Sequence, residues 1–370
     1  MKIQIIFISF FALLLSSCQT QNKKSNPIEI KLDYHDKSPS FYNISFTKEA
    51  LVIDGSDDEP KWQHSPWSSR FVDISLADSA SIPHYSTQFK MLWDSSYLYI
   101  YAKLEEPHIW GNLHERDTVI YYNNDFEVFI DPNGDTYNYG EIEINALNTV
   151  WDLLLDKPYS LGGKANNHWD INGFKSAVYV NGTLNNNRDI DSFWSIEMAI
   201  PMKALLELKN KPRTIPSDGE QWMMNFSRVH WDHDLIGQKY DRKKVNEKYQ
   251  REYNWVWNSQ NEINMHIPER WGIVEFSKKG ESPNREFHKS DKWELSRIAY
   301  QLFRDIRFGK QKSLLGTKTY DRKYLNIKVL EYSLPAIFNK TEMGFEILLG
   351  PDLQGNKLAI DQNGKLKWFN

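Results

Sequence analysis

Residues 123–156, NNDFEVFIDPNGDTYNYGEIEINALNTVWDLLLD, carry the clearest periodicity in the chain. In the first half, apolar side chains occupy every second position: Phe126, Val128 and Ile130. The turn 131–135 follows, and the alternation resumes with Ile142 and Ile144. Because side chains alternate between the two faces of a strand, this pattern predicts two neighbouring strands that share one apolar face.

The opposite face of these two strands is polar. Its side chains include Glu127, Glu143 and Asn145, and Trp151 and Asp152 follow just beyond the second strand. Carboxylate and amide groups form paired hydrogen bonds with hydroxyl groups. This face therefore suits a ligand that is rich in hydroxyl groups.

Composition limits the possible partners. The chain has 370 residues, enough for one large domain with an appendage or for two domains, and its formal net charge is -4. It offers no basic field, so nucleic acid is not expected as a partner. Aromatic residues make up 14% of the chain and include 14 tryptophans, more than core packing alone usually requires, so some rings should be exposed.

The N-terminus resembles a bacterial lipoprotein signal. Lys2 precedes the apolar run 5–15, which is too short for a comfortable membrane span, and Leu15-Ser16-Ser17-Cys18 follows. The resemblance implies that cleavage leaves Cys18, the only cysteine, as the lipidated first residue. Residues 1–18 are then the signal and 19–43 a polar tether. The mature protein would lie at the bacterial cell envelope, held to a membrane by its lipid alone.

Short strands and frequent turns predict an all-β domain over residues 44–278. Strands are expected at the following ranges: 51–55, 88–93, 97–104, 124–131, 141–146, 175–180, 193–200, 222–226 and 271–276. Pro201 should begin a short helix that ends near Leu208, and the charged segment 232–254 should be a surface loop with some helix. Many strands with few helices favour an antiparallel β-sandwich.

Residues 279–370 differ in pattern and predict a small α+β appendage. Apolar side chains at helical spacing form one stripe: Leu295, Ile298, Ala299, Leu302, Phe303 and Ile306. Ser290 is a candidate N-cap for this helix, and strands are expected after it. The stripe should pack on the sandwich or on a partner protein.

Several segments together resemble the family 9 carbohydrate-binding modules of the DOMON-like superfamily. The segments are Ile53-Asp54-Gly55 with Asp58-Glu59 and Trp62, Trp93-Asp94 with 97–100, 124–131, and Trp271-Gly272. The resemblance spans about residues 44–278. It implies a jelly-roll type β-sandwich that binds saccharides between aromatic rings and holds structural calcium. Where the family has its two stacking rings, this chain has Tyr121 and Tyr122, and then Met265 and His266.

A sugar ring needs an aromatic plane for its C–H face and polar groups for its hydroxyls. The candidate aromatic residues are Trp110, Tyr121, Tyr122, Trp151, Trp169 and Trp257. The candidate polar residues are Glu127, Glu143, Asn145, Asp152 and Arg228, with Arg270 as a further possibility. Each ring could instead cap the core, and the carboxylates could form a solvated strand face.

Oxygen ligands recur at alternate positions in Asp131, Asn133 and Asp135, as they do in calcium loops. A plain hairpin turn explains the same residues without a metal. Asp54, Asp57 and Asp58 form a second, weaker candidate. No cofactor is required by the sequence, and structural Ca²⁺ is an expectation that rests on the resemblance and on these side chains.

The sequence favours non-catalytic saccharide binding by an envelope lipoprotein that supports glycan breakdown or uptake beside a glycan-degrading enzyme. No nucleophile elbow, phosphate loop, dinucleotide fingerprint or HExxH zinc motif is present. Two alternatives stay open. A glycoside hydrolase could use Glu127 with Glu143 or Asp152, and a scaffold protein could dock a neighbour through the C-terminal helix and strands.

Overall fold

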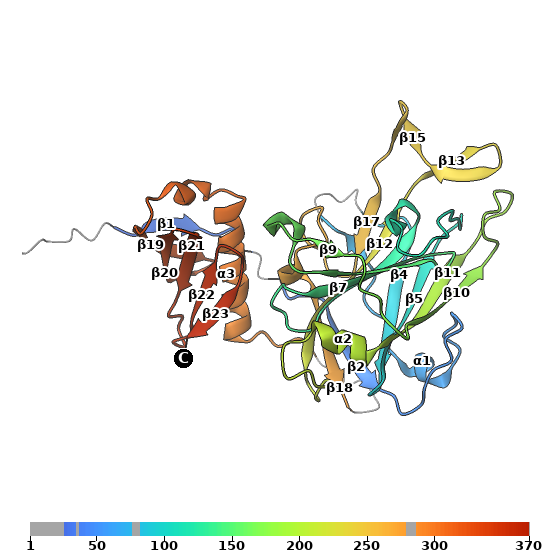
Figure 1. Cartoon of the computed structure of the whole chain (residues 1–370), viewed down its shortest axis with the longest axis horizontal. Coiled ribbons are helices and arrows are strands. Elements are labelled where there is room, and N and C mark those ends of the chain that lie inside the picture. The colour runs from blue at the N-terminus through green and yellow to red at the C-terminus, as the bar shows by residue number, and fades with distance from the viewer. Residues whose placement is uncertain (1–25, 35–36, 76–81, 279–285, 370) are drawn as a thin grey trace, which may run out of the picture.

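The computed structural model describes residues 26–34, 37–75, 82–278 and 286–369. The predicted signal and Cys18 lie outside these residues. Figure 1 shows two bodies, a large domain rich in strands and a small domain that contains the C-terminus. In the described part of the chain, no helix has the length and apolarity needed to cross a membrane.

One 13-stranded sheet builds the large domain and curls around its own apolar face. In spatial order its main strands are β10 (Lys175–Asn181), β11 (Phe193–Pro201), β5 (Tyr97–Glu105), β4 (Thr87–Trp93), β2 (Phe41–Phe46), β18 (Gly272–Ser277), β12 (Gln221–His230), β6 (Asp125–Asp131), β7 (Tyr139–Asn145), β8 (Val150–Leu155) and β9 (Ala165–Asn166). β17 (Tyr253–Val256) pairs with β12 and with β3 (Val72–Asp73). The all-β sandwich prediction is confirmed. The sheet is not purely antiparallel, because β2 runs parallel to both β18 and β4.

The core lies between the two halves of the curled sheet. Phe126, Val128 and Ile130 of β6 are fully buried there, as their spacing predicts. Phe89 of β4 meets Phe226 of β12 across the core with 3.9 Å between ring centroids. The other face of β6 and β7 therefore remains for polar side chains.

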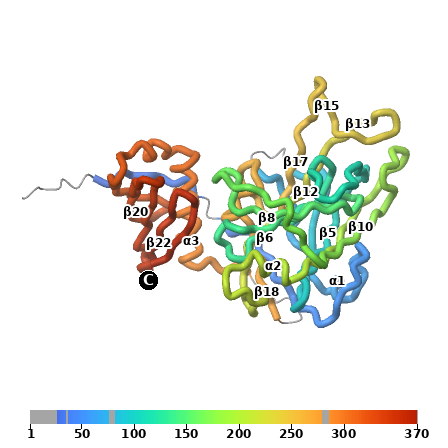
Figure 2. Tube along the Cα trace, viewed as in Figure 1, coloured from blue at the N-terminus to red at the C-terminus, as the bar shows by residue number. Residues whose placement is uncertain are grey.

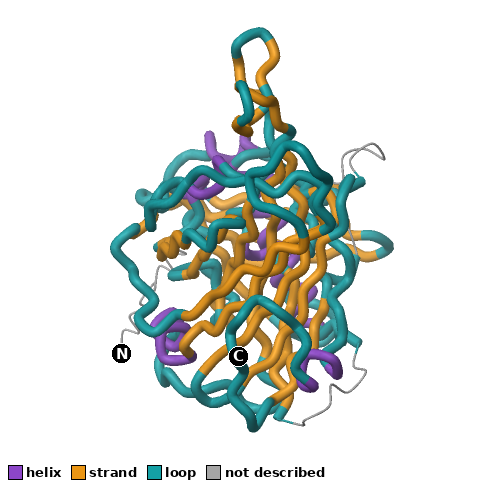
Figure 3. Tube along the Cα trace, turned by 90° about the vertical axis from the view of Figure 1, so that its right-hand side faces the viewer, coloured by secondary structure: helices purple, strands orange, loops and turns teal. Residues whose placement is uncertain are grey.

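Helices and hairpins lie at the periphery of this domain (Figure 3). They are α1 (Pro60–His64), α2 (Met202–Leu208), η2 (Ile120–Tyr122), η3 (Tyr159–Leu161) and η4 (Pro268–Arg270). The segment 232–254 holds no helix, contrary to the prediction; it forms the hairpins β13 (His233–Ile236) with β14 (Lys239–Arg242) and β15 (Lys244–Val245) with β16 (Lys248–Tyr249). The strand predicted at 51–55 is absent, because that segment packs as coil over α1 and β5.

The small domain packs α3 (Asp291–Arg307) on a six-stranded sheet. In spatial order the strands are β1 (Ile28–Lys31), β19 (Arg322–Val329), β20 (Tyr332–Thr341), β21 (Gly344–Leu349), β22 (Lys357–Asp361) and β23 (Leu366–Phe369). The single-turn η5 (Lys312–Gly316) follows α3. Ser290 caps α3 as predicted, since its Oγ accepts a hydrogen bond from Trp293 N at 3.2 Å.

Two expectations about this domain need correction. β1 lies inside the predicted tether 19–43, and Figure 2 shows it beside the C-terminal strands. β1 runs parallel to β19, and its Ile30 is buried with the apolar stripe of α3 in the domain's own core. That stripe is therefore covered within the small domain and offers no docking face to the sandwich or to a neighbour.

Candidate functional site

A row of side chains crosses four strands on the face of the sheet that turns away from the core. Ser227 of β12 stands opposite Glu127 of β6, Glu127 opposite Glu143 of β7, and Glu143 opposite Trp151 of β8. Directly opposed residues in antiparallel strands point to the same face. The row therefore places a hydroxyl, two carboxylates and an indole side by side.

A cavity of about 460 Å³ lies over this row. Glu127, Glu141 and Glu143 contribute carboxylates to it, and Tyr121, Trp151 and Tyr159 contribute rings. The remaining lining residues are Ile74, Phe129, Leu153, Val229, Arg251, Glu252, Asn254, Ile263, Asn264, Met265 and His266. We call this cavity the acidic pocket.

Local structure fixes the rings around the acidic pocket. Tyr121 sits on η2, and its backbone N donates a hydrogen bond to Glu143 Oε2 at 3.1 Å. Tyr159 sits on η3, with its ring edge-on to His266 at 4.5 Å between centroids. Nδ1 of His266 lies 3.0 Å from the hydroxyl of Tyr139, and burial lowers the pKa of His266 to about 4. The imidazole is therefore neutral at pH 7.

The carboxylates of the acidic pocket are deeply buried. Burial raises the pKa of Glu127 to about 7. Burial, and next the charge of Glu127, raise the pKa values of both Glu141 and Glu143 well above the usual range. Among the described residues, no lysine or arginine forms an ion pair with these three side chains. Arg251 is exposed at the rim.

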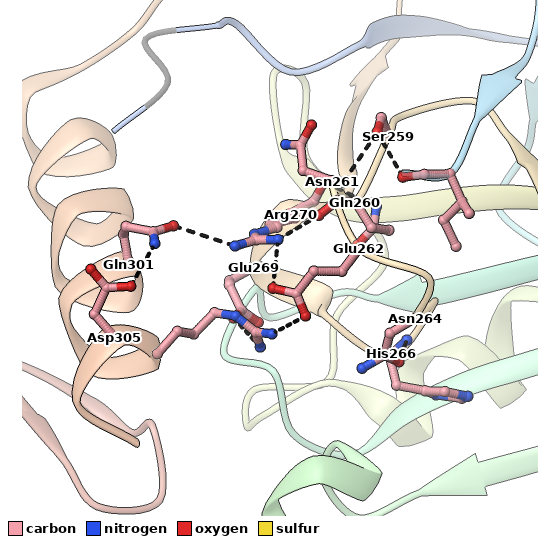
Figure 4. A network of polar contacts seen from close by, with 12 residues as sticks. Ser259, Gln260, Asn261, Glu262, Asn264, His266, Glu269, Arg270, Gln301 and Asp305 are labelled. Carbon is pink, nitrogen blue, oxygen red and sulfur yellow. Dashed lines mark hydrogen bonds and ion pairs between the residues drawn. The ribbon is translucent and has the colours of Figure 1, made fainter. Parts of the chain in front are cut away.

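A polar network ties one wall of the acidic pocket to the small domain (Figure 4). The wall is the segment 259–267, which we call the wall loop. Arg270 donates to Gln260 O at 2.5 Å and pairs with Glu262 at 3.1 Å. Glu262 also pairs with Arg304 of α3 at 2.7 Å, and Arg270 donates to Gln301 of α3 at 3.3 Å. Helix α3 thus braces the loop that carries Asn264 and His266.

Four of the predicted ligands line the acidic pocket: Tyr121, Glu127, Glu143 and Trp151. Tyr122 lies next to it, with its ring 4.9 Å from that of Tyr121. Tyr122 is 43% exposed, and the guanidinium of Arg242 lies over its ring at 4.4 Å from the centroid.

Four other predicted ligands are buried away from the acidic pocket. Trp257 belongs to the main core, and Trp110 packs in a smaller cluster beside Tyr240. Arg228 is fully buried and pairs with Glu106 at 2.8 Å. Asp152 stands opposite Ile142, so it points to the core side, where it binds Arg116 and the backbone N of Ile171. Their positions exclude contact with a ligand in this cavity.

Asn145 and Trp169 are also engaged elsewhere. Asn145 shares the polar face with Glu143 but is fully buried, and its amide donates to Leu113 O at 2.9 Å. Trp169 packs on the core side against Gly140, where an added Cβ would lie 3.2 Å from its ring. Both side chains serve local packing.

The oxygen atoms of Asp131, Asn133 and Asp135 accept hydrogen bonds from N–H groups of the chain. Asp131 accepts from the backbone N of Asn133, Gly134 and Thr136 at 2.8–3.2 Å. Asn133 Oδ1 and Asp135 Oδ2 accept from Asn210 at 2.8 and 3.0 Å. These bonds shape the hairpin turn and occupy the atoms that a calcium ion would need. Calcium binding here stays a prediction that this geometry does not favour.

Several lining residues escaped the sequence reasoning. Glu141 is on the predicted polar face, and its alternation with Ile142 was a usable signal. Tyr159, Asn254 and Asn264 come from loops and a strand distant in sequence, whereas Met265 and His266 stand where the family resemblance has its second stacking ring. No local pattern reveals that such residues meet over one sheet face.

Comparison with known proteins identifies the family of this chain. The model of the carbohydrate family 9 binding domain-like family matches residues 53–279, and the chain belongs to this family. No curated protein matches the chain. Similar solved structures include a family 9 carbohydrate-binding module from Caldicellulosiruptor kristjanssonii with cellotriose (16% identity, TM-score 0.41, covering 67% of this chain and 100% of that one) and with glucose (17%, 0.41, 66% and 100%).

Proposed function

We propose that the acidic pocket binds a saccharide without cleaving it. The observation that carries this proposal is the row of buried carboxylates bordered by the rings of Tyr121, Trp151 and Tyr159 in one cavity. Rings accept the C–H face of a sugar, and carboxylates accept its hydroxyl protons. Membership of the carbohydrate family 9 binding domain-like family supports the same function.

Affinity electrophoresis and calorimetry against a panel of soluble glycans test the proposal. The panel includes cellotriose and glucose, the sugars held by the two relatives. A polar ligand that meets few anchor residues should bind with a Kd in the micromolar to millimolar range, or about −8 to −4 kcal/mol. If no glycan in a broad panel retards the protein, saccharide binding is rejected.

Removing one pocket ring should weaken binding by about ten-fold, because a stacking contact contributes roughly 1 kcal/mol beyond its buried area. The variants are Tyr121→Ala and Trp151→Ala, and calorimetry measures their Kd values. Tyr179→Ala is the matched control, since Tyr179 is 46% exposed on β10 at the far edge of the sheet. Equal losses in all three variants would contradict a site at the acidic pocket.

Glycoside hydrolysis remains the alternative for the same pocket, because Glu127 and Glu143 stand opposite one another in it. Release of reducing ends from the bound glycan, abolished in Glu127→Gln, would replace the binding proposal. Asp152 is no longer a candidate partner, since it lies on the other face of the sheet. The scaffold alternative loses its predicted docking face, because the stripe of α3 is buried in its own domain.

We infer the place of action from the sequence around Cys18. We propose a lipid anchor at this cysteine, so that the protein displays the acidic pocket at the cell envelope and supplies glycan to a neighbouring degrading enzyme. Cys18→Ser should abolish labelling by radioactive fatty acid and release the protein from the membrane fraction. Unchanged labelling would reject the anchor.

A further inference from the structure

Among the described residues, no cation pairs with the carboxylates beneath the acidic pocket. Charged groups are rarely buried unless they are paired, because burial without a partner costs several kcal/mol. Buried Glu106 of the same domain has such partners, since it lies 2.8 Å from Arg228 and 3.2 Å from His230. At Glu127 and Glu143 the compensating positive charge must come from protons or from a ligand.

Three carboxylates converge on one point. Asp125, Glu127 and Glu143 each offer an oxygen atom, and these three atoms all lie within 4.8 Å of one another. A calcium ion binds oxygen ligands at about 2.3–2.6 Å, so two ligands of one ion lie up to roughly 5 Å apart. The trio therefore has the spacing of ligands around a single divalent cation.

One buried oxygen atom of the trio itself has no hydrogen-bond partner among the described residues. Asp125 is fully buried, and while its Oδ1 accepts from Val229 N at 3.2 Å, its Oδ2 has none. Ser227, fully buried opposite Glu127, interacts with that carboxylate. Buried polar atoms almost always have a partner, so Asp125 Oδ2 points to a missing ligand.

The second acidic trio of the domain shows how the chain neutralises such a cluster without a ligand. Asp117, Asp152 and Asp170 also bring three oxygen atoms within 4.8 Å of one another. The guanidinium of Arg116 reaches all three, with 3.6 Å to Asp117 and 3.3 Å to Asp170 and a short contact to Asp152. In the described part of the chain, no arginine or lysine forms an ion pair with the trio under the acidic pocket, and Arg228, whose charge acts on Asp125, is paired with Glu106.

We propose that Asp125, Glu127 and Glu143 bind a divalent cation of the calcium type at the base of the acidic pocket. Asp125 would contribute its unpartnered Oδ2, Ser227 lies beside Glu127 as a further oxygen, and the pocket side of the ion stays open to water. In a second step, which rests on the proposed function, saccharide hydroxyls replace that water. Specificity then favours sugars with two adjacent hydroxyls able to reach the ion.

Calorimetric titration of the chelator-treated full chain with CaCl₂, and separately with MgCl₂, tests the site in the absence of sugar. We expect one calcium site with a Kd of about 0.1–1 mM, the range of extracellular calcium modules. Asp125→Asn and Glu143→Gln should weaken it by about ten-fold or more, because each removes one charged ligand. Asp170→Asn, in the trio that Arg116 neutralises, is the matched control and should bind like the wild type.

Thermal melts show whether the variants are folded and whether calcium stabilises them. Removing a carboxylate from an unpaired buried cluster relieves repulsion, so Glu143→Gln should fold and melt no lower than the calcium-free wild type. Calcium should raise the melting temperature of the wild type and leave that of Glu143→Gln nearly unchanged. No calcium binding at about 10 mM, ten times the upper Kd expected, or equal binding by wild type and Glu143→Gln, overturns the proposal.

The same samples separate this proposal from the saccharide proposal. Calcium binding without any glycan binding would support the ion site and reject the proposed function. If glycan binding is unchanged in the presence of a chelator and calorimetry detects no calcium binding, the proposed function is supported and the ion site is rejected. Binding of glucosamine but not of calcium would identify an ammonium group as the missing cation and overturn the metal site.

Discussion

Replacing Arg228 by methionine should lower the free energy of unfolding by about 3–5 kcal/mol. Arg228 is fully buried and donates to Glu106 Oε2 at 2.8 Å and to Thr87 Oγ1 at 3.1 Å. Methionine preserves much of the volume but removes the charge, leaving buried Glu106 with His230, Asn124 and the backbone N of His108. Burial also lowers the pKa of His230, so this histidine compensates the carboxylate poorly. Loss of one partner from a buried pair is costly for this reason.

Urea unfolding followed by tryptophan fluorescence measures the effect of Arg228→Met. Arg188→Met is the control, because Arg188 is exposed in the same domain. The sequence alone makes Arg228 a sugar ligand, whereas the structure places it in the core pair. A variant that keeps its stability but loses glycan affinity would restore the ligand role and refute the structural one.

Local periodicity explains why so much of the sheet could be predicted. The alternation in 123–156 predicts β6 and β7, and Tyr97–Glu105 alternates in the same way. Alternation within one strand identifies its buried face even when the neighbouring strands are not known. β1 was missed because its four residues pair with β19, almost 300 residues away in sequence. Short strands whose partners are distant carry too little local signal.

The paired carboxylates of the site could be predicted from the sequence, but the exposure of its rings could not. Glu127 and Glu143 could be placed together, because register in a hairpin follows from the turn. The exposure of a ring depends on what packs over it, which no local pattern reports. Trp151 therefore lies in the acidic pocket as predicted, while Trp110 and Trp257, with similar sequence surroundings, are only 2% exposed.

Arg270→Ala should weaken glycan binding by about ten-fold, or roughly 1.4 kcal/mol. The alanine removes the side-chain bonds of Arg270 with Gln260, Glu262 and Gln301, and it leaves the pair between Glu262 and Arg304 of α3 in place. The wall loop then has more conformations in the free protein. Ordering it on binding costs free energy that the braced loop does not spend. The loss should appear as a higher Kd, although the wall-loop residues Asn264 and His266 are still present in the variant.

A graded series separates the contribution of the small domain from that of the loop itself. Gln301→Ala removes the bond from Arg270 to α3, together with a bond from Gln301 to Asp305 within α3, so its Kd should lie between those of the wild type and Arg270→Ala. Arg322→Ala, an exposed arginine on β19, should bind like the wild type. If Gln301→Ala also matches the wild type while Arg270→Ala does not, the bonds of Arg270 within the large domain brace the wall loop. If Arg270→Ala binds as tightly as the wild type, the wall loop is ordered by its other contacts, such as Ser259 Oγ to Ile74 O at 2.7 Å and the pair between Glu262 and Arg304. The bracing by Arg270 would then have no part in ligand binding.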